Sequence, residues 1–263
     1  MEYSIEEKMN MSVERLRQEQ NAEFLNELSE NAEVVHRSSW AIIIKDGRYR
    51  YKMYYSDNLG RIKREIVMLQ LMGQVPIQFL CDNLETYYSK EDVFGLEDIA
   101  PNDNDCTIAE QVDYWCTKWN QRKDFAICAR KIWQSEMVPY MVNMLTLYGE
   151  DAEKHLEYLH SLQEEVFIHG GFTLDNIKKS GEKLVILDFE TTFLGPKLWD
   201  KTIFVYSLIE HGYMELGMKL FEKFQCTKQM LACIAAVHLA IATSEEKVNF
   251  TPRKMAYDFI KDI

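Results

Sequence analysis

The pattern of apolar residues changes close to residue 100, and this change constrains the fold more than any other feature of the chain. Before it, short runs such as WAIIIKDG and RYRYKMYY are rich in branched and aromatic residues, which is typical of strands. After Asp105, segments such as CTIAEQVDYWCTKW carry apolar residues at helical spacing. The order predicts an α+β fold with two lobes: a small antiparallel sheet within residues 1–100 and a larger, mainly helical lobe in residues 101–263.

The smaller lobe can be divided further. Residues 1–30 are dense in polar residues with apolar ones at loosely helical spacing, so one or two helices should precede the sheet. Three strands follow, with a hairpin at residues 46–47, where Asp-Gly favours a tight turn. Residues 58–73 predict an amphipathic helix, and a second hairpin is expected around residues 91–92. In the helical lobe, Pro139 predicts a kink.

Charge and composition narrow the partners and the compartment. A net charge of −12 argues against a nucleic-acid partner, because the acidic surface would repel phosphates. The longest apolar stretch, residues 230–242, is too short to span a bilayer, so no membrane partner is expected. The first ten residues lack an apolar signal region, and the six cysteines form no CxxC pair. These features favour a cytoplasmic protein.

Polar residues follow two apolar strands in the stretch FIHGGFTLDNIKKSGEKLVILDFETTFLGPKLWD. The first strand ends at His169, a loop leads to Asn176, and the second strand ends at Asp188. Side chains at such positions can be presented to a ligand by the loops that carry them. Amide and carboxylate oxygens suit Mg²⁺, which takes few protein ligands and adds phosphate oxygens. We therefore expect Asn176 and Asp188 to hold a metal ion.

The order and spacing of these residues resemble the catalytic loop and metal-binding segment of the aminoglycoside phosphotransferase and choline kinase families. The pattern there is H-G-D-x-x-x-x-N, then apolar-I-D-[FW]-E, then G-P-x-x-x-D. The third loop position departs from it, because the families have Asp there and this chain has Gly171. The positions that match are His169, Asn176, Asp188, Phe189, Glu190, Gly195, Pro196 and Asp200.

A second match lies upstream. Lys52 falls within the strand RYRYKMYY, and Glu65 follows thirteen residues later on the amphipathic helix. In kinase-like folds a strand lysine orients the nucleotide phosphates and a helix glutamate holds that lysine. Taken singly, each could be an ordinary surface residue. Their conjunction with the loop pattern implies an ion pair at a nucleotide site.

Other parts of that site are implied by the resemblance alone. The segment DVFGLEDIAP resembles the last strand of the smaller lobe and the hinge, so Glu97 to Ile99 would offer backbone groups to the base of ATP or GTP. HRSSW stands where a phosphate-binding turn is expected, with no glycine, and Ser38 and Ser39 would contact phosphate there.

Gly171 leaves the mechanism open. In the families that resemble this chain, the missing aspartate accepts the proton of the acceptor hydroxyl and positions its oxygen, and glycine can do neither. Another carboxylate could substitute, with Asp175 nearest in sequence and Glu190 next. Otherwise the protein is an inactive pseudokinase, or different chemistry takes place in the same cleft.

Three function classes follow. The first is Mg²⁺-dependent phosphoryl transfer from ATP or GTP to a hydroxyl of a small molecule, neutral or cationic, with an atypical base. The second is a nucleotide-binding pseudokinase that acts as a regulatory or partner-binding subunit. The third is a helical binding protein without a nucleotide. The third class is disfavoured, because a protein that binds no nucleotide has no physical need for the set Lys52, Glu65, Asn176 and Asp188.

Overall fold

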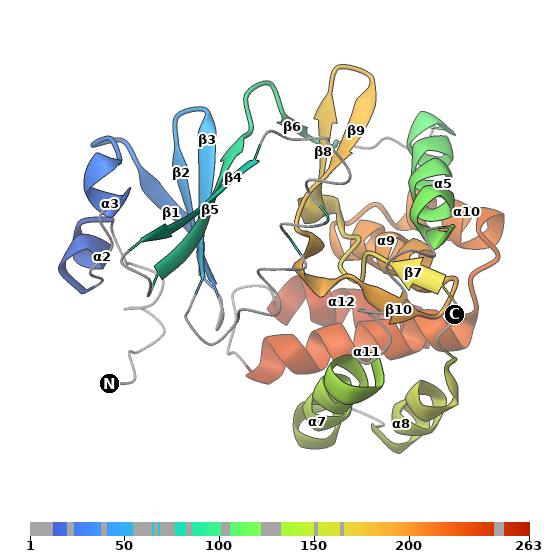
Figure 1. Ribbon diagram of the computed structural model, residues 1–263. Helices are drawn as coiled ribbons and strands as arrows, with labels where there is room; N and C mark the ends of the chain where they lie inside the picture. The colour runs from blue at the N-terminus through green and yellow to red at the C-terminus, as the bar shows by residue number, and fades with distance from the viewer. Residues whose placement is uncertain are drawn as a thin grey trace. The chain divides into compact units, whose positions relative to one another are not determined.

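The computed structural model divides the chain into two compact units, residues 1–96 and residues 97–263 (Figure 1). The sequence pattern had placed this change at residues 100–101. The residues that the structure describes are 13–19, 24–37, 41–54, 65, 68, 77–82, 86–100, 106–121, 133–149, 152–163, 166–244 and 250–263.

The first unit is built on a five-stranded antiparallel sheet with strand order β1-β2-β3-β5-β4. Its strands are β1 (Glu33–Arg37), β2 (Ala41–Asp46), β3 (Tyr49–Tyr54), β4 (Ile77–Asp82) and β5 (Thr86–Asp92). The predicted hairpin at residues 46–47 is confirmed, because Asp46 pairs with Tyr49. Gly47 between them has φ +57°, a left-handed conformation that glycine adopts without strain.

The predicted hairpin at residues 91–92 is wrong. Both residues belong to β5, which pairs along its whole length with β3 and β4. The acidic pair resembles a turn in sequence, but Glu91 is fully buried opposite Arg50 on β3. The Arg50 Nε donates to Glu91 Oε2 at 2.6 Å. A cross-strand ion pair therefore accommodates an acidic residue in the middle of the sheet.

Helices α2 (Val13–Glu19) and α3 (Phe24–Glu27) pack against one face of this sheet. Phe24 stacks on Tyr88 with ring centroids 4.0 Å apart, and Tyr51 and Met53 of β3 are buried in the same cluster. Because side chains alternate along a strand, Lys52 lies on the opposite face. The core of the unit thus fixes which face of β3 is available to a ligand.

The predicted helix over residues 58–73 lies mostly outside the described residues. Glu65 and Met68 are described, and both are helical and buried.

The second unit is mainly helical, as predicted, and with the sheet of the first unit it confirms the α+β class. The largely buried helices α9 and α11 form its centre, and α11 packs against α7, α8, α9 and α12. Its helices are α5 (Cys106–Asn120), α7 (Val138–Tyr148), α8 (Ala152–Ser161), α9 (Trp199–Glu210), α10 (Met214–Lys223), α11 (Lys228–Ser244) and α12 (Phe250–Lys261).

The kink expected at Pro139 takes another form. A π-helical turn, Trp133–Met137, runs directly into α7, and Pro139 occupies the first turn of that helix. A proline is tolerated there because its missing N–H would have no partner within the helix. The irregularity therefore lies just before the proline.

Two small sheets carry the loops of interest in the second unit. β7 (Val166–Ile168) pairs with β10 (Phe193–Gly195), and β8 (Ile177–Ser180) lies between β6 (Glu97–Asp98) and β9 (Lys183–Ile186). Within the described part of the chain, no helix combines the length and the apolar character that crossing a membrane requires.

Candidate functional site

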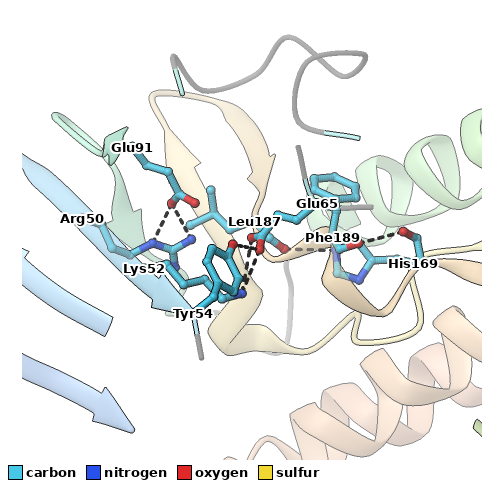
Figure 2. A network of polar contacts seen from close by, with 9 residues as sticks. Arg50, Lys52, Tyr54, Glu65, Glu91, His169, Leu187 and Phe189 are labelled. Carbon is cyan, nitrogen blue, oxygen red and sulfur yellow. Dashed lines mark hydrogen bonds and ion pairs between the residues drawn. The ribbon is translucent and has the colours of Figure 1, made fainter. Parts of the chain in front are cut away.

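The predicted ion pair between Lys52 and Glu65 is present. The Lys52 Nζ lies 3.0 Å from Glu65 Oε2 and 3.4 Å from Oε1, and both side chains are buried. Tyr54, two residues along β3 on the same face, donates its hydroxyl to the same carboxylate (Figure 2). Its ring centroid also lies 5.4 Å from Lys52 Nζ.

Tyr54 stays a donor in this cluster. Burial, followed by the charge of Glu65, raises the pKa of its hydroxyl well above the usual value. The Glu65 carboxylate therefore receives hydrogen bonds from a neutral phenol and from a cation. A buried ion pair adds little net stability, because desolvation offsets the attraction. The pair is therefore weak evidence for a stabilising role in the fold.

In the second unit, the loop that follows β7 is anchored through its backbone. The N–H groups of His169 and Gly170 donate to the two oxygens of Asp200, at 2.7 Å and 2.9 Å. Asp200 lies in the first turn of α9 and is buried, and burial raises its pKa to about 6. The start of the loop is thus fixed to the central helix.

The His169 side chain closes the loop from inside. Its Nδ1 accepts the N–H of Gly171 at 3.2 Å, so its Nε2 carries the proton and donates to the carbonyl of Leu187 at 3.0 Å (Figure 2). The ring is buried and lies 4.7 Å from the ring of Phe189. With both nitrogens engaged, His169 supports the loop and is not placed to react.

Asn176, at the end of this loop, lies close to the segment after β9 that carries Asp188. The Asn176 Nδ2 donates to the Gly171 carbonyl at 2.9 Å, which leaves its Oδ1 as the oxygen for a ligand. Its own carbonyl accepts the N–H of Leu187, the residue before Asp188, at 2.8 Å. Asp188 follows β9 in a left-handed conformation, φ 65° and ψ 63°, which is uncommon outside glycine and recurs at functional sites.

These two residues fit the chemistry of Mg²⁺, which prefers an octahedron of oxygens and completes it with water and phosphate. The described residues contain no group of three or more His, Cys, Asp or Glu side chains that could hold a metal ion by themselves. A cation at Asn176 and Asp188 would therefore depend on oxygens from a ligand, which is how Mg²⁺ is held with a nucleotide.

Gly171 has an ordinary backbone conformation, outside the left-handed region. A Cβ at this position would lie 3.1 Å from Thr191 Oγ1, 3.6 Å from Asn176 Nδ2 and 4.0 Å from His169 Nδ1. No backbone atom stands in the way. A Cβ here would therefore meet only side chains, and the hydroxyl of Thr191 would have to shift by a few tenths of an ångström to admit it.

Asp175 is directed to the end of α9. Its Oδ1 lies 3.4 Å from Nε2 of His211, whose Nδ1 donates to the Ser207 carbonyl at 2.7 Å. The Asp175 carboxylate raises the pKa of His211 to about 9, and His211 in turn lowers the pKa of Asp175. The pair is ionised at neutral pH, so Asp175 is a weaker base than a free carboxylate.

The Asp175–His211 pair lines two cavities of the second unit. One has a volume of about 410 Å³ and also includes Ile99, and the other, about 510 Å³, includes Met214 and Met255. Both are open to solvent and lined by polar as well as apolar side chains.

The remaining predicted residues are placed as follows. Glu97 is exposed in β6, where it pairs with Lys179. Ser38 and Ser39 lie outside the described residues, as does the side chain of Glu190.

Sequence reasoning missed the contacts that Tyr54, Thr191 and His211 make with Glu65, position 171 and Asp175. Tyr54 could have been found, because residues two apart on a strand share a face and Lys52 had been identified. Thr191 and His211 carried no signal, since only folding of the chain brings them to Gly171 and Asp175.

No family model and no curated protein matches the sequence, whereas several solved structures share its fold. A choline/ethanolamine kinase family protein from Mesorhizobium loti superposes with a TM-score of 0.63 at 12% identity, covering 96% of this chain and 94% of that one. The amicoumacin kinase hAmiN, in complex with AMP-PNP, Ca²⁺ and Ami, gives 0.60 at 9% identity, with coverages of 94% and 96%. The GDP complex of aminoglycoside 2′-phosphotransferase-IIIa gives 0.55 at 11% identity, with coverages of 92% and 99%. The chain thus has the protein-kinase-like fold of choline kinases and aminoglycoside phosphotransferases.

Proposed function

We propose that the protein binds ATP or GTP with Mg²⁺ and transfers the terminal phosphoryl group to a hydroxyl of a small molecule. The observation that carries this proposal is the buried pair of Lys52 and Glu65, on the face of β3 opposite the one that packs against α2 and α3. A buried lysine and glutamate add little net stability to a fold, because desolvation offsets their attraction. In a kinase fold that binds a nucleotide, the lysine contacts the phosphates, which accounts for its burial beside the glutamate.

The chain's own residues divide the work. Lys52, held by Glu65 and Tyr54, would contact the phosphates, and the oxygens of Asn176 and Asp188 would hold Mg²⁺. Mg²⁺, when bound, offsets negative charge on the phosphates. The fold neighbours supply precedent, since one was solved with AMP-PNP and Ca²⁺ and another with GDP.

The contacts with the base and the outer phosphates belong to the same proposal. Backbone groups of Glu97 to Ile99 would contact the base, with the Ile99 side chain beside a cavity. Ser38 and Ser39 would contact phosphate oxygens.

Transfer should be slow, because Gly171 provides no base. Asp175 and Glu190 remain candidates for that role. The pairing of Asp175 with His211 counts against Asp175, because it lowers the basicity of the carboxylate. Phosphoryl transfer nevertheless depends mainly on the positioning of the reactants and on electrostatic stabilisation. Loss of the base should therefore slow the reaction but not stop it.

Gly171 also supports a second candidate, a nucleotide-binding pseudokinase that serves as a regulatory or partner-binding subunit. The two candidates share the nucleotide and differ in turnover. Release of labelled phosphate from the γ-position, to water or to a panel of small alcohols and amino alcohols, separates them.

A thermal-shift titration with ATP and with GTP, with and without Mg²⁺, tests the binding that both candidates require. We expect Mg²⁺ to strengthen the stabilisation by nucleotide, and Asp188→Ala to abolish that dependence. Asp258→Ala, which removes an exposed carboxylate from α12, is the matched control and should behave like the wild type. A folded Asp188→Ala protein with unchanged Mg²⁺ dependence would refute the metal assignment.

A further inference from the structure

We propose that the hydroxyl of Thr191 contacts the acceptor hydroxyl directly and positions it for attack, in the place that an aspartate at position 171 would otherwise occupy. This inference rests on the proposed function and assigns a residue that the sequence pattern does not mark.

The first support is proximity. A Cβ built on Gly171 would lie 3.1 Å from Thr191 Oγ1, closer than to any other atom outside its chain neighbours. The oxygens of an aspartate are two bonds from its Cβ, so an aspartate here would bring them into the region that Thr191 Oγ1 borders. Thr191 is partly exposed, so its hydroxyl is not sealed in the core.

The second support is the direction of the hydroxyl proton. Thr191 Oγ1 donates to the carbonyl of His169 at 3.3 Å. A hydroxyl has one proton and two lone pairs, so with its proton engaged Thr191 can accept a proton from another O–H group. The His169 carbonyl is itself fixed, because the backbone of His169 is tied to Asp200. The threonine hydroxyl is thus oriented to accept a hydrogen bond. An aspartate at position 171 would position the acceptor hydroxyl through the same kind of contact, and would in addition remove its proton.

The proposed step balances without a strong base. The acceptor oxygen forms a bond to the γ-phosphorus while the bond from that phosphorus to the β,γ-bridging oxygen breaks, and the nucleoside diphosphate leaves with that electron pair. The acceptor proton points to Thr191 Oγ1 during the approach and passes to solvent water as the new bond forms. A loose transition state needs little removal of that proton beforehand.

The test compares affinities for MgADP with and without aluminium fluoride, in the full chain. In such complexes the fluoride stands for the transferring phosphoryl group and an axial water stands for the acceptor hydroxyl. Thr191→Val removes the hydroxyl at nearly constant shape, and Thr191→Ser keeps it. The neighbouring Thr192 provides the matched control Thr192→Val, since its hydroxyl donates to the carbonyl of Phe189 at 2.7 Å and is buried.

We expect fluoride to tighten MgADP binding in the wild type, and Thr191→Val to reduce that tightening about threefold to tenfold, the worth of one hydrogen bond. Affinity for MgADP alone should not change, and Thr191→Ser and Thr192→Val should keep the full tightening. A smaller effect of Thr191→Val in the Gly171→Asp background would further support the inference, because the carboxylate then takes over the contact.

The inference is overturned if Thr191→Val binds MgADP and shows the wild-type tightening, or if fluoride tightens nothing in a wild type that binds MgADP. Both results leave nucleotide binding intact. Absence of MgADP binding by the wild type would instead refute the proposed function, and this inference with it.

Discussion

Restoring the carboxylate by Gly171→Asp is the most direct perturbation of the site, and its structural cost can be worked out. The new Cβ meets Thr191 Oγ1 at 3.1 Å, which a shift of a few tenths of an ångström relieves, and its other neighbours are at ordinary contact distances. Mild overpacking costs about 1 kcal/mol. Replacing a glycine whose conformation other residues can adopt raises the free energy of unfolding by about 0.4–1 kcal/mol, because the unfolded chain loses conformational freedom. The variant should therefore fold with a stability within about 1 kcal/mol of the wild type.

The expected gain in turnover is much larger than this cost. A positioned general base contributes a factor of about 10²–10⁴, which corresponds to about 3–5 kcal/mol of activation free energy. Saturating Mg²⁺-nucleotide with a coupled assay for diphosphate release measures it. Gly171→Asn has the same shape without a basic oxygen, and Gly171→Ala reports the effect of the Cβ alone. We expect both to remain within about threefold of the wild type, on the scale of one weak hydrogen bond.

One result would refute the reasoning about this position. If the wild type already turns over at about 1–100 s⁻¹, the range of ordinary kinases, and a folded Gly171→Asp variant that binds nucleotide is no faster, another residue is the base. Asp175→Asn and Glu190→Gln would then identify it.

Three further predictions concern stability. Lys52→Met leaves the buried Glu65 without its cation and should lower the free energy of unfolding, measured by urea titration, by about 3 kcal/mol. The double variant Lys52→Met/Glu65→Leu should recover part of this loss. An unchanged urea midpoint in Lys52→Met would contradict burial of the pair. The folded-state pKa of His211, about 9, lies above the unfolded value near 6.5, so its contribution is complete below pH 6.5 and is lost as the pH rises through 9. Because the partner Asp175 is 76% exposed, we expect the ion pair to contribute about 1 kcal/mol to the free energy of unfolding. The wild type should lose melting temperature between pH 6.5 and 10, and His211→Gln should not show this loss. An equal loss in both proteins would contradict the prediction. Gly217→Ala in α10 should destabilise the protein by about 1–3 kcal/mol in thermal melts, because the new Cβ would lie 2.8 Å from a side chain of α9. An increase in stability would instead mean that the α9 side chain moves aside at little cost.

The elements that sequence could predict are those with local signals. The change of periodicity near residue 100 identifies the fold class, and the Asp-Gly turn at residues 46–47 identifies one hairpin. The pairing of Lys52 with Glu65 was predicted from the resemblance to kinase-like folds, in which a strand lysine is held by a helix glutamate. Residues 91–92 misled because Arg50 neutralises Glu91 and Arg48 neutralises Asp92 from the neighbouring strand or its turn, partners that no local pattern indicates.

The same limit applies to the site. The positions of Asn176 and Asp188 follow from the ends of two strands, but the hydrogen bond between Asn176 and Gly171 depends on how the loop folds back. The contact of Asp175 with His211 changes the expected basicity of Asp175, and it joins residues from separate elements. Such interactions are set by tertiary packing and become visible only in three dimensions.

The anchoring of the loop by Asp200 has a consequence for how the proposed activity could change in evolution. The carboxylate binds the N–H groups of residues 169 and 170, so this anchor does not involve the side chain at position 171. A single nucleotide substitution in a glycine codon of the form GGT or GGC produces an aspartate codon, and the reverse change is equally short. A lineage of such proteins could therefore move between slow and fast turnover in one mutational step, with the rest of the scaffold left as it stands.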